Sequence, residues 1–138
     1  MKILKKKLSI TLLVFLVSIT LSALAGGTDT YNGQISTVAN WSAKLSVSDY
    51  DNYAVASTTI YPYSSTTQLY CQVDLYIIQR NPVTQHNSVK ESHIVADYKE
   101  YGSTGVPSDS GYYIIAASSY HEAYCDGYFD STDLGVMP

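Results

Sequence analysis

The sequence predicts an all-β protein: an antiparallel β-sandwich of about 6–8 strands that follows an N-terminal helical signal peptide. Three observations support this prediction. Apolar and polar side chains alternate with period two in most segments beyond residue 30. Residues typical of turns separate these alternating segments. No segment beyond residue 25 has the apolar stripe of period 3.6 that an amphipathic helix requires.

Residues 1–25 contain the three parts of a secretory signal peptide in the expected order. Four lysines within residues 2–7 form a positive segment, residues 8–21 are an apolar run, and residues 22–26 supply the small side chains of a cleavage site. The run of about 14 residues is shorter than the ~20 that cross a bilayer as a helix. An uncleaved anchor is the alternative. We therefore expect residues 26–138 to form one secreted mature domain without a membrane span.

Cleavage would change the charge of the protein. The chain carries 8 Lys and Arg and 12 Asp and Glu, for a net charge of −4. Four of the eight basic residues lie in the signal segment, so the mature domain would hold four basic and twelve acidic residues, a net charge of −8. Nucleic acids and anionic membranes bind clustered Lys and Arg, so this balance argues against both as partners.

The first half of the mature chain contains the clearest alternation. Residues 41–48 place Trp, Ala, Leu and Val on one face and Ser and Lys on the other, which predicts a half-buried strand. Residues 49–52 (Asp-Tyr-Asp-Asn) predict a turn, because Asp and Asn side chains bond to the nearby backbone. Residues 53–61 predict a second strand that completes a hairpin, and a short strand over 31–38 opens the domain.

The second half divides in the same way. Residues 68–79 predict the strongest strand, with Leu, Cys, Val and Ile on one face and Tyr, Gln and Asp on the other. Residues 102–111 contain three Gly and one Pro among Ser and Thr, and predict a long loop. The other expected segments are connections over 62–67 and 80–88, a weaker strand over 89–101, a long strand over 112–125, and a short strand near 128–129.

The two cysteines predict one disulfide bond. Cys71 and Cys125 are the only cysteines, and an exported protein with an even number usually pairs them. Each shares a strand face with aliphatic residues, so the bond would join a central strand to the last long strand beside the core. A closed loop of about 55 residues would add roughly 4 kcal/mol of stability. Two free buried thiols are the alternative.

The sequence shows no established motif for catalysis, and we expect no catalytic residues and no cofactor. It lacks G-x-S-x-G and a glycine-rich phosphate loop. His121 and Cys125 have a spacing that suits a metal only on a helix, since a strand separates them by about 13 Å. Asp126, Asp130 and Asp133 are the candidates for a calcium site, although they lack the D-x-[DN]-x-[DN]-G spacing of a dedicated loop.

Tyrosine is the most distinctive component. All 14 Tyr lie beyond residue 25, with one Trp and two Phe in the whole chain. Tyrosine combines a rigid apolar ring with a polar tip, and mixtures of Tyr and Ser are typical of adaptable binding surfaces. Tyrosine is also a good strand former, which is the structural alternative. The densest segments give the candidate binding surface: Tyr61, Tyr63, Tyr120, Tyr124 and Tyr128.

Three classes of function are compatible with these features. The first is a small secreted non-enzymatic binding module that contacts a protein or carbohydrate surface, either on other cells as a bacteriocin-like or toxin-like factor or at a cell surface. The second is an extracellular structural protein that self-associates through its strand edges. The third is a small secreted hydrolase, which would need a pocket with paired acids or a partnered histidine.

Overall fold

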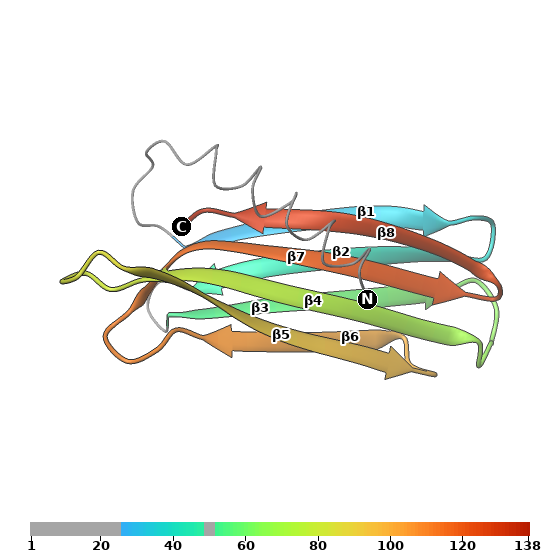
Figure 1. The fold of residues 1–138 in the computed structure, drawn as a ribbon. Coiled ribbons are helices and arrows are strands. Elements are labelled where there is room, and N and C mark those ends of the chain that lie inside the picture. The colour runs from blue at the N-terminus through green and yellow to red at the C-terminus, as the bar shows by residue number, and fades with distance from the viewer. Residues whose placement is uncertain (1–25, 49–51) are drawn as a thin grey trace.

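The computed structural model describes residues 26–48 and 52–138, and these residues form two four-stranded antiparallel sheets packed face to face (Figure 1). The all-β class and the sandwich are therefore confirmed. The proposed signal peptide over 1–25 lies outside the described residues. The strands are β1 (Gly27–Ile35), β2 (Ala39–Ser48), β3 (Tyr53–Pro62), β4 (Leu69–Arg80), β5 (Asn87–Asp97), β6 (Tyr101–Pro107), β7 (Tyr113–Cys125) and β8 (Tyr128–Val136).

The chain passes three times between the two sheets. The first sheet has the order β1-β2-β3-β6, and the second has the order β5-β4-β7-β8. Strands β1, β2 and β3 follow one another as hairpins, as do β4 with β5 and β7 with β8. At one side of the sandwich β1 contacts β8, and at the other side β6 contacts β5. Each sheet therefore has two edge strands, and each edge lies beside an edge of the other sheet.

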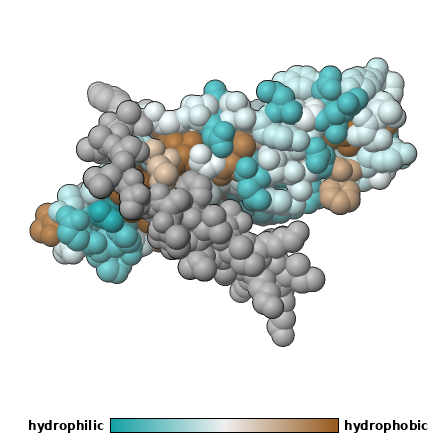
Figure 2. Space-filling model, turned by 90° about the horizontal axis from the view of Figure 1, so that it is seen from above, coloured by the Kyte–Doolittle hydropathy of each residue, from teal (hydrophilic) through white to brown (hydrophobic). Residues whose placement is uncertain are grey.

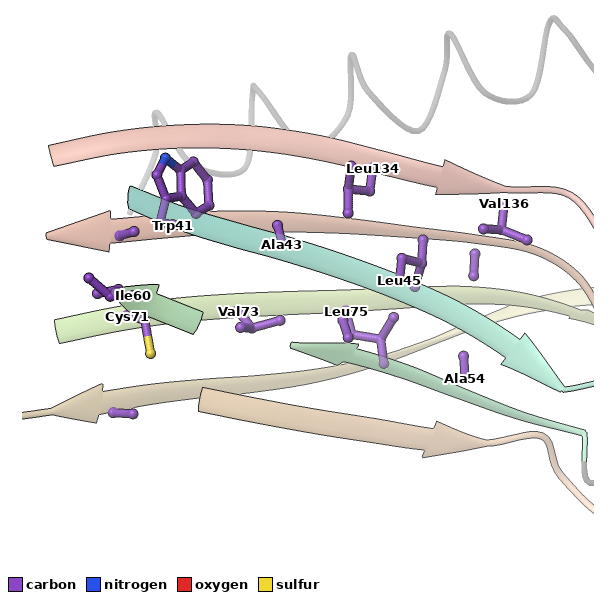
Figure 3. Packing of buried hydrophobic residues seen from close by; sticks show 14 of the residues in the cluster. Trp41, Ala43, Leu45, Ala54, Ile60, Cys71, Val73, Leu75, Leu134 and Val136 are labelled. Atoms are coloured by element: carbon purple, nitrogen blue, oxygen red, sulfur yellow. The ribbon is translucent and has the colours of Figure 1, made fainter. Parts of the chain in front are cut away.

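The predicted alternation correctly separates the core from the surface. On β2, Trp41, Ala43 and Leu45 are buried, while the residues between them are exposed or half-buried. The same face of β4 buries Val73 and Leu75, which lie between the sheets with the β2 residues (Figure 3). Burying such side chains is worth roughly 1.5–3 kcal/mol each, so these residues are the main source of stability.

The prediction of a loop over residues 102–111 is wrong for the first half of this segment, because that half forms β6. The glycines of this strand allow neighbouring side chains to pack closely against its backbone. A Cβ atom on Gly102 would lie 2.8 Å from the Cys71 Sγ atom, and one on Gly105 would lie 2.1 Å from the Tyr53 hydroxyl oxygen. The chain turns before β6, where Tyr98 has a φ of 58°. The expected strand over 89–101 is thus divided between β5, this turn and the start of β6.

The expected turn over 49–52 lies mostly outside the described residues. Its last member, Asn52, is described and has a φ of 46°, which is the left-handed conformation that Asn tolerates in turns. Its carbonyl oxygen accepts a hydrogen bond from the backbone N–H of Ser108 at 2.9 Å. This bond joins the β2–β3 connection to the β6–β7 connection.

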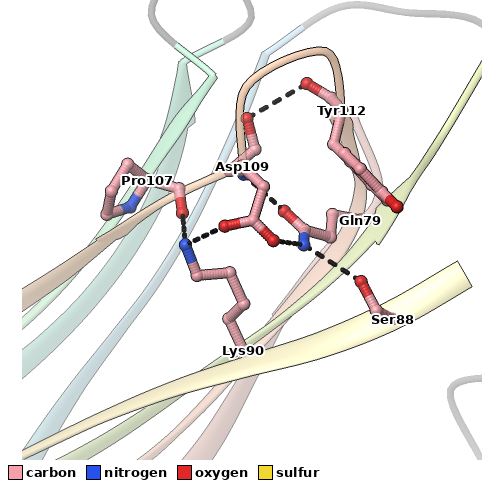
Figure 4. A network of polar contacts seen from close by, with 7 residues as sticks. Gln79, Ser88, Lys90, Pro107, Asp109 and Tyr112 are labelled. Carbon is pink, nitrogen blue, oxygen red and sulfur yellow. Dashed lines mark hydrogen bonds and ion pairs between the residues drawn. The ribbon is translucent and has the colours of Figure 1, made fainter.

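A network of polar contacts also holds the β6–β7 connection (Figure 4). Gln79, which is buried on β4, accepts a hydrogen bond from the backbone N–H of Asp109 at 2.7 Å and donates to its carboxylate. Lys90 on β5 contacts the Asp109 carboxylate at 2.9 Å and donates to the Pro107 carbonyl at 2.8 Å. The bonds from Lys90 and Gln79 lower the pKa of Asp109. The network fixes this connection against two strands of the second sheet.

The predicted disulfide bond is wrong, because the two thiols are free and are not at disulfide distance. Both cysteines lie in the same sheet, on neighbouring strands. Cys71 on β4 is opposite Ala123, and Cys125 on β7 is opposite Leu69. They are therefore diagonal neighbours two residues out of register, with Cα atoms about 7–8 Å apart, beyond the usual range of a disulfide. The Cys71 Sγ atom faces Gly102 on β6 instead.

We expect both thiols to be unreactive in the native protein. Burial raises the pKa of Cys71 to about 11, and burial together with Asp126 raises the pKa of Cys125. Only the thiolate attacks a disulfide reagent, and neither side chain is exposed. Ellman titration of residues 26–138 without reductant should count no reactive thiol in buffer and two in denaturant. Zero thiols in denaturant would mean that the cysteines pair after all.

Candidate binding surface

Exposed aromatic rings gather at one end of the sandwich. This aromatic end contains the connections over 36–38, 63–68, 98–100 and 126–127, on the right in Figure 1. Backbone hydrogen bonds join these connections to one another and to the adjacent strands, for example from Tyr63 to Val38 at 2.9 Å. The exposed rings at this end are Tyr61, Tyr63, Tyr98, Tyr101, Tyr128 and Phe129.

The five tyrosines predicted from the sequence do not form one surface. Tyr61 is on β3 in the first sheet, and Tyr63 follows it with its hydroxyl group donating to the Asn40 side chain at 2.8 Å. Tyr120 and Tyr124 are on β7, on the outer face of the second sheet. Tyr128 begins β8 after the turn at the aromatic end. The structure thus divides the candidates between the two outer faces of the sandwich and this turn.

The outer face of the second sheet carries a row of three rings. Tyr70 on β4 is directly opposite Tyr124 on β7, which is directly opposite Phe129 on β8. The rings of Tyr70 and Tyr124 are stacked, with centroids 5.4 Å apart and an interplanar angle of 26°. Phe129 is 69% exposed. We call Tyr70, Tyr120, Tyr124 and Phe129 the aromatic platform.

One carboxylate positions two rings of the aromatic platform. The Glu122 Oε1 atom accepts a hydrogen bond from the Tyr70 hydroxyl group, and its Oε2 atom accepts one from the Tyr120 hydroxyl group at 2.9 Å. Glu122 lies between Tyr120 and Tyr124 along β7 and opposite Gln72 on β4. The hydroxyl ends of both rings are therefore fixed, and one face of the Tyr70 ring is covered by Tyr124.

A second carboxylate on the same face is almost fully buried. Asp74 is 5% exposed, accepts a hydrogen bond from the Gln72 side chain at 2.8 Å and pairs with the His93 Nδ1 atom. Tyr76, the next outward residue on β4, has its pKa raised to about 12 by burial and by the charges of Asp74 and Glu91. The face therefore has a negative local potential.

Charge is distributed unequally between the two outer faces. The outward rows of the second sheet from Tyr70 to Tyr76 contain no Lys or Arg. On the first sheet, the outward residues of β1 between Thr28 and Gln34 and the residues opposite them on β2 and β3 are mainly Ser, Thr, Asn and Gln. Lys44 is the charged residue among them. The outward-facing carboxylates of the second sheet are Asp74, Glu91, Asp97, Glu122 and Asp133.

Figure 2 shows the hydropathy of the side where β1 and β8 meet. The visible described residues are mostly white to teal, with brown areas near the middle and toward both ends. Tyrosine, serine and threonine have intermediate values on this scale.

A histidine between two hydroxyl groups lies inside the sandwich. The His121 Nδ1 atom is 2.8 Å from the Thr58 hydroxyl oxygen on β3, and its Nε2 atom is 2.7 Å from the Ser119 hydroxyl oxygen. Neither His121 nor Thr58 has exposed surface, and Ser119 is 2% exposed. Burial lowers the pKa of His121 to about 4. A substrate has no access to these groups, so the cluster bonds the two sheets together through their interior.

The three calcium candidates are not brought together. Asp130 faces the interior, where it accepts a hydrogen bond from the Trp41 indole N–H at 2.9 Å. Asp133 is on the opposite face of β8, opposite Tyr120. Asp126 is in the turn before β8 and accepts a hydrogen bond from Thr66. Among residues 26–48 and 52–138, no group of three or more His, Cys, Asp or Glu side chains is arranged to hold a metal ion.

Sequence reasoning missed Tyr70, Phe129 and the role of Glu122. The alternation in residues 68–79 and 112–125 does place Tyr70, Glu122 and Tyr124 on outward faces. Their contact depends on the register between β4, β7 and β8, which is a non-local property.

The described part of the chain contains no helix with the length and apolar character to cross a membrane. Comparison of the chain with protein-family models, with curated proteins and with solved structures finds no match, so the surface is interpreted from its own geometry.

Proposed function

We propose that the protein is a small non-enzymatic binding module, exported from the cell, that holds a neutral carbohydrate surface on its aromatic platform. The row formed by Tyr70, Tyr124 and Phe129 carries this proposal. Adjacent strands are about 4.8 Å apart, so three rings in a row span about 10 Å. This length suits a short run of sugar rings, whose C–H faces pack against aromatic faces.

The polar groups beside the platform favour a ligand with many hydroxyl groups. Glu122 and Asp133 lie on the same outward face and carry carboxylate oxygens, which accept hydrogen bonds from hydroxyl groups. The same carboxylates disfavour phosphorylated, sulfated or uronic ligands through like-charge repulsion. A flat sheet face also suits an extended surface more than a small molecule, which usually binds in a concave pocket.

Replacing Tyr124 with Ala is expected to lower the affinity for the carbohydrate at least tenfold, because it removes the central ring of the row. A tenfold loss corresponds to about 1.4 kcal/mol, within the range for one aromatic contact. The mature protein would be tested by affinity electrophoresis and pull-down against neutral polysaccharides: a β-glucan, chitin and mannan. The melting temperature should change little, because Tyr124 packs outside the core.

Tyr63→Ala is the matched control, since it removes an exposed ring in the β3–β4 connection, whose hydroxyl group bonds to Asn40 of the first sheet. Loss of binding in this variant with normal binding in Tyr124→Ala would move the site to the first sheet. Equal binding by wild type and Tyr124→Ala, or binding to none of the three polysaccharides, would contradict the proposal. A fall in both melting temperature and affinity in Tyr124→Ala would indicate a structural role instead.

A further inference from the structure

We propose that β5 is an association edge that pairs antiparallel with β5 of a second copy of this chain, centred on Ser92. Strand β5 is the edge of the second sheet, is bonded to β4 alone and is 11 residues long. Exposed and partly exposed residues alternate along nearly all of it. Two of its outward side chains are apolar and exposed, Val89 at 51% and Val95 at 45%.

Backbone groups of the other edge strands are already bonded, including the Thr30 N–H on β1, which donates to the Asp29 side chain at 2.9 Å. On β8, the backbone N–H of Gly135 donates to the Asp29 side chain at 3.1 Å, so a group of this edge is already bonded across to β1. On β6, the carbonyl of Pro107 accepts a bond from Lys90. Among the described residues, no turn, loop or side chain is bonded to the backbone of Asn87–Asp97. Long exposed edges without such protection are templates for strand pairing.

The sequence of β5 is self-complementary in one register. With Ser92 opposite Ser92 of the second copy, Val89 lies opposite Val95 and Glu91 lies opposite His93, and each pair occurs twice. Apolar pairs and pairs of a carboxylate with an imidazole stabilise adjacent strands. His93 would then lie between Asp74 of its own chain and Glu91 of the second copy.

Other registers are less favourable. A centre at Glu91 would place two Glu91 carboxylates opposite each other, and a centre at His93 would place Val89 opposite Asp97. Like charges directly opposite each other destabilise a strand pair. The Ser92 register is therefore the one that matches both the exposed valines and the charged side chains. It also gives a closed two-fold contact, which limits assembly to a dimer.

The dimer would contain one continuous eight-stranded sheet. The two-fold axis of an antiparallel strand pair is perpendicular to the sheet, so both aromatic platforms would face the same side. If the proposed function holds, two sites on one surface would raise the avidity for a carbohydrate layer. The dimer itself does not depend on that function and is tested without a ligand.

Two double variants, each of which replaces both exposed valines with charged residues, test the register. In Val89→Lys/Val95→Lys, lysines face lysines across the two-fold axis, and we expect the dimer dissociation constant to rise at least 100-fold. In Val89→Glu/Val95→Lys, each Glu faces a Lys, and we expect the dimer to persist. Sedimentation equilibrium of the mature protein from micromolar to millimolar concentration would measure the masses, and circular dichroism would confirm that all variants are folded.

Three outcomes would overturn the proposal. A wild-type protein that stays monomeric at millimolar concentration has no such interface. A dimer that persists in Val89→Lys/Val95→Lys forms through another surface. Concentration-dependent growth beyond a dimer indicates an open assembly through two different edges. A wild-type protein that binds polysaccharide as a monomer would support the proposed function and contradict the proposed dimer. The failure of one proposal can therefore be distinguished from the failure of the other.

Discussion

Lowering the pH from 7 to 4 is expected to reduce the free energy of unfolding by about 3 kcal/mol through His121 alone. The pKa of this histidine is about 4 in the folded protein because it is buried, although the charge of Asp74 acts in the opposite direction. The ordinary histidine pKa of 6.5 applies to the unfolded chain. Between these two values the unfolded chain binds a proton that the folded protein does not bind, so unfolding becomes more favourable as the pH falls.

The contribution of His121 to stability changes mainly over the pH range between its two pKa values. Above about pH 6.5 the imidazole is neutral in both states, and its full contribution to stability is present. From pH 6.5 to pH 4 stability falls by up to about 1.4 kcal/mol per pH unit. Below pH 4 both states bind the proton, and His121 causes no further loss.

Urea unfolding at a series of pH values would test this expectation with His121→Gln, which is similar in size and does not titrate. The difference between the wild-type and variant stabilities should shrink between pH 6.5 and pH 4 and be constant above pH 7. His86→Gln, which removes an exposed histidine between β4 and β5, is the matched control. Parallel pH profiles for wild type and His121→Gln would show that His121 is not the source of the acid sensitivity.

Replacing Trp41 with Ala is expected to lower the free energy of unfolding by about 3–5 kcal/mol. The side chain is 1% exposed, its ring centroid is 5.1 Å from that of Tyr31, and its N–H donates to Asp130. The substitution would leave a large cavity between β2 and β8 and would remove a donor from a carboxylate that faces the interior. Both effects add to the loss.

Trp41→Phe should leave a smaller cavity than Trp41→Ala, because it keeps a six-membered aromatic ring and removes the N–H donor together with the rest of the indole. We expect this variant to lose about 1–3 kcal/mol. Stability would be measured by far-ultraviolet circular dichroism in urea, since Trp41 is the only tryptophan and its fluorescence disappears with it. A loss below 1 kcal/mol for Trp41→Ala would mean that the ring does not fill the core at this position.

The local pattern was sufficient to predict the strands, because strand periodicity depends on neighbouring residues. Trp41 and Leu45 are buried as the alternation indicates, and β4 was placed within a residue of its observed limits. The glycines of β6 misled the prediction, since glycine favours turns locally. In the fold, Gly102 is required because a Cys71 side chain from the other sheet approaches it.

Properties that depend on register could not be predicted. The pairing of Cys71 with Cys125 failed because the two strands are neighbours with an offset of two residues, which no local signal records. The grouping of tyrosines by sequence density failed for the same reason. Tyr61 and Tyr124 occur in dense segments but belong to different sheets, while Tyr70 and Tyr124, 54 positions apart in the sequence, are stacked.

The two hydrogen bonds that Glu122 accepts from tyrosine hydroxyl groups affect the thermodynamics of the proposed binding. The rings of Tyr70 and Tyr120 are attached to the bodies of long strands and are held at their tips, so little rotational freedom remains for a ligand to remove. Ordering a mobile side chain on binding usually costs about 0.5–1.5 kcal/mol, and that cost is largely absent here. Association should therefore be fast, without a slow conformational step, and calorimetry should report a small entropic penalty from the protein.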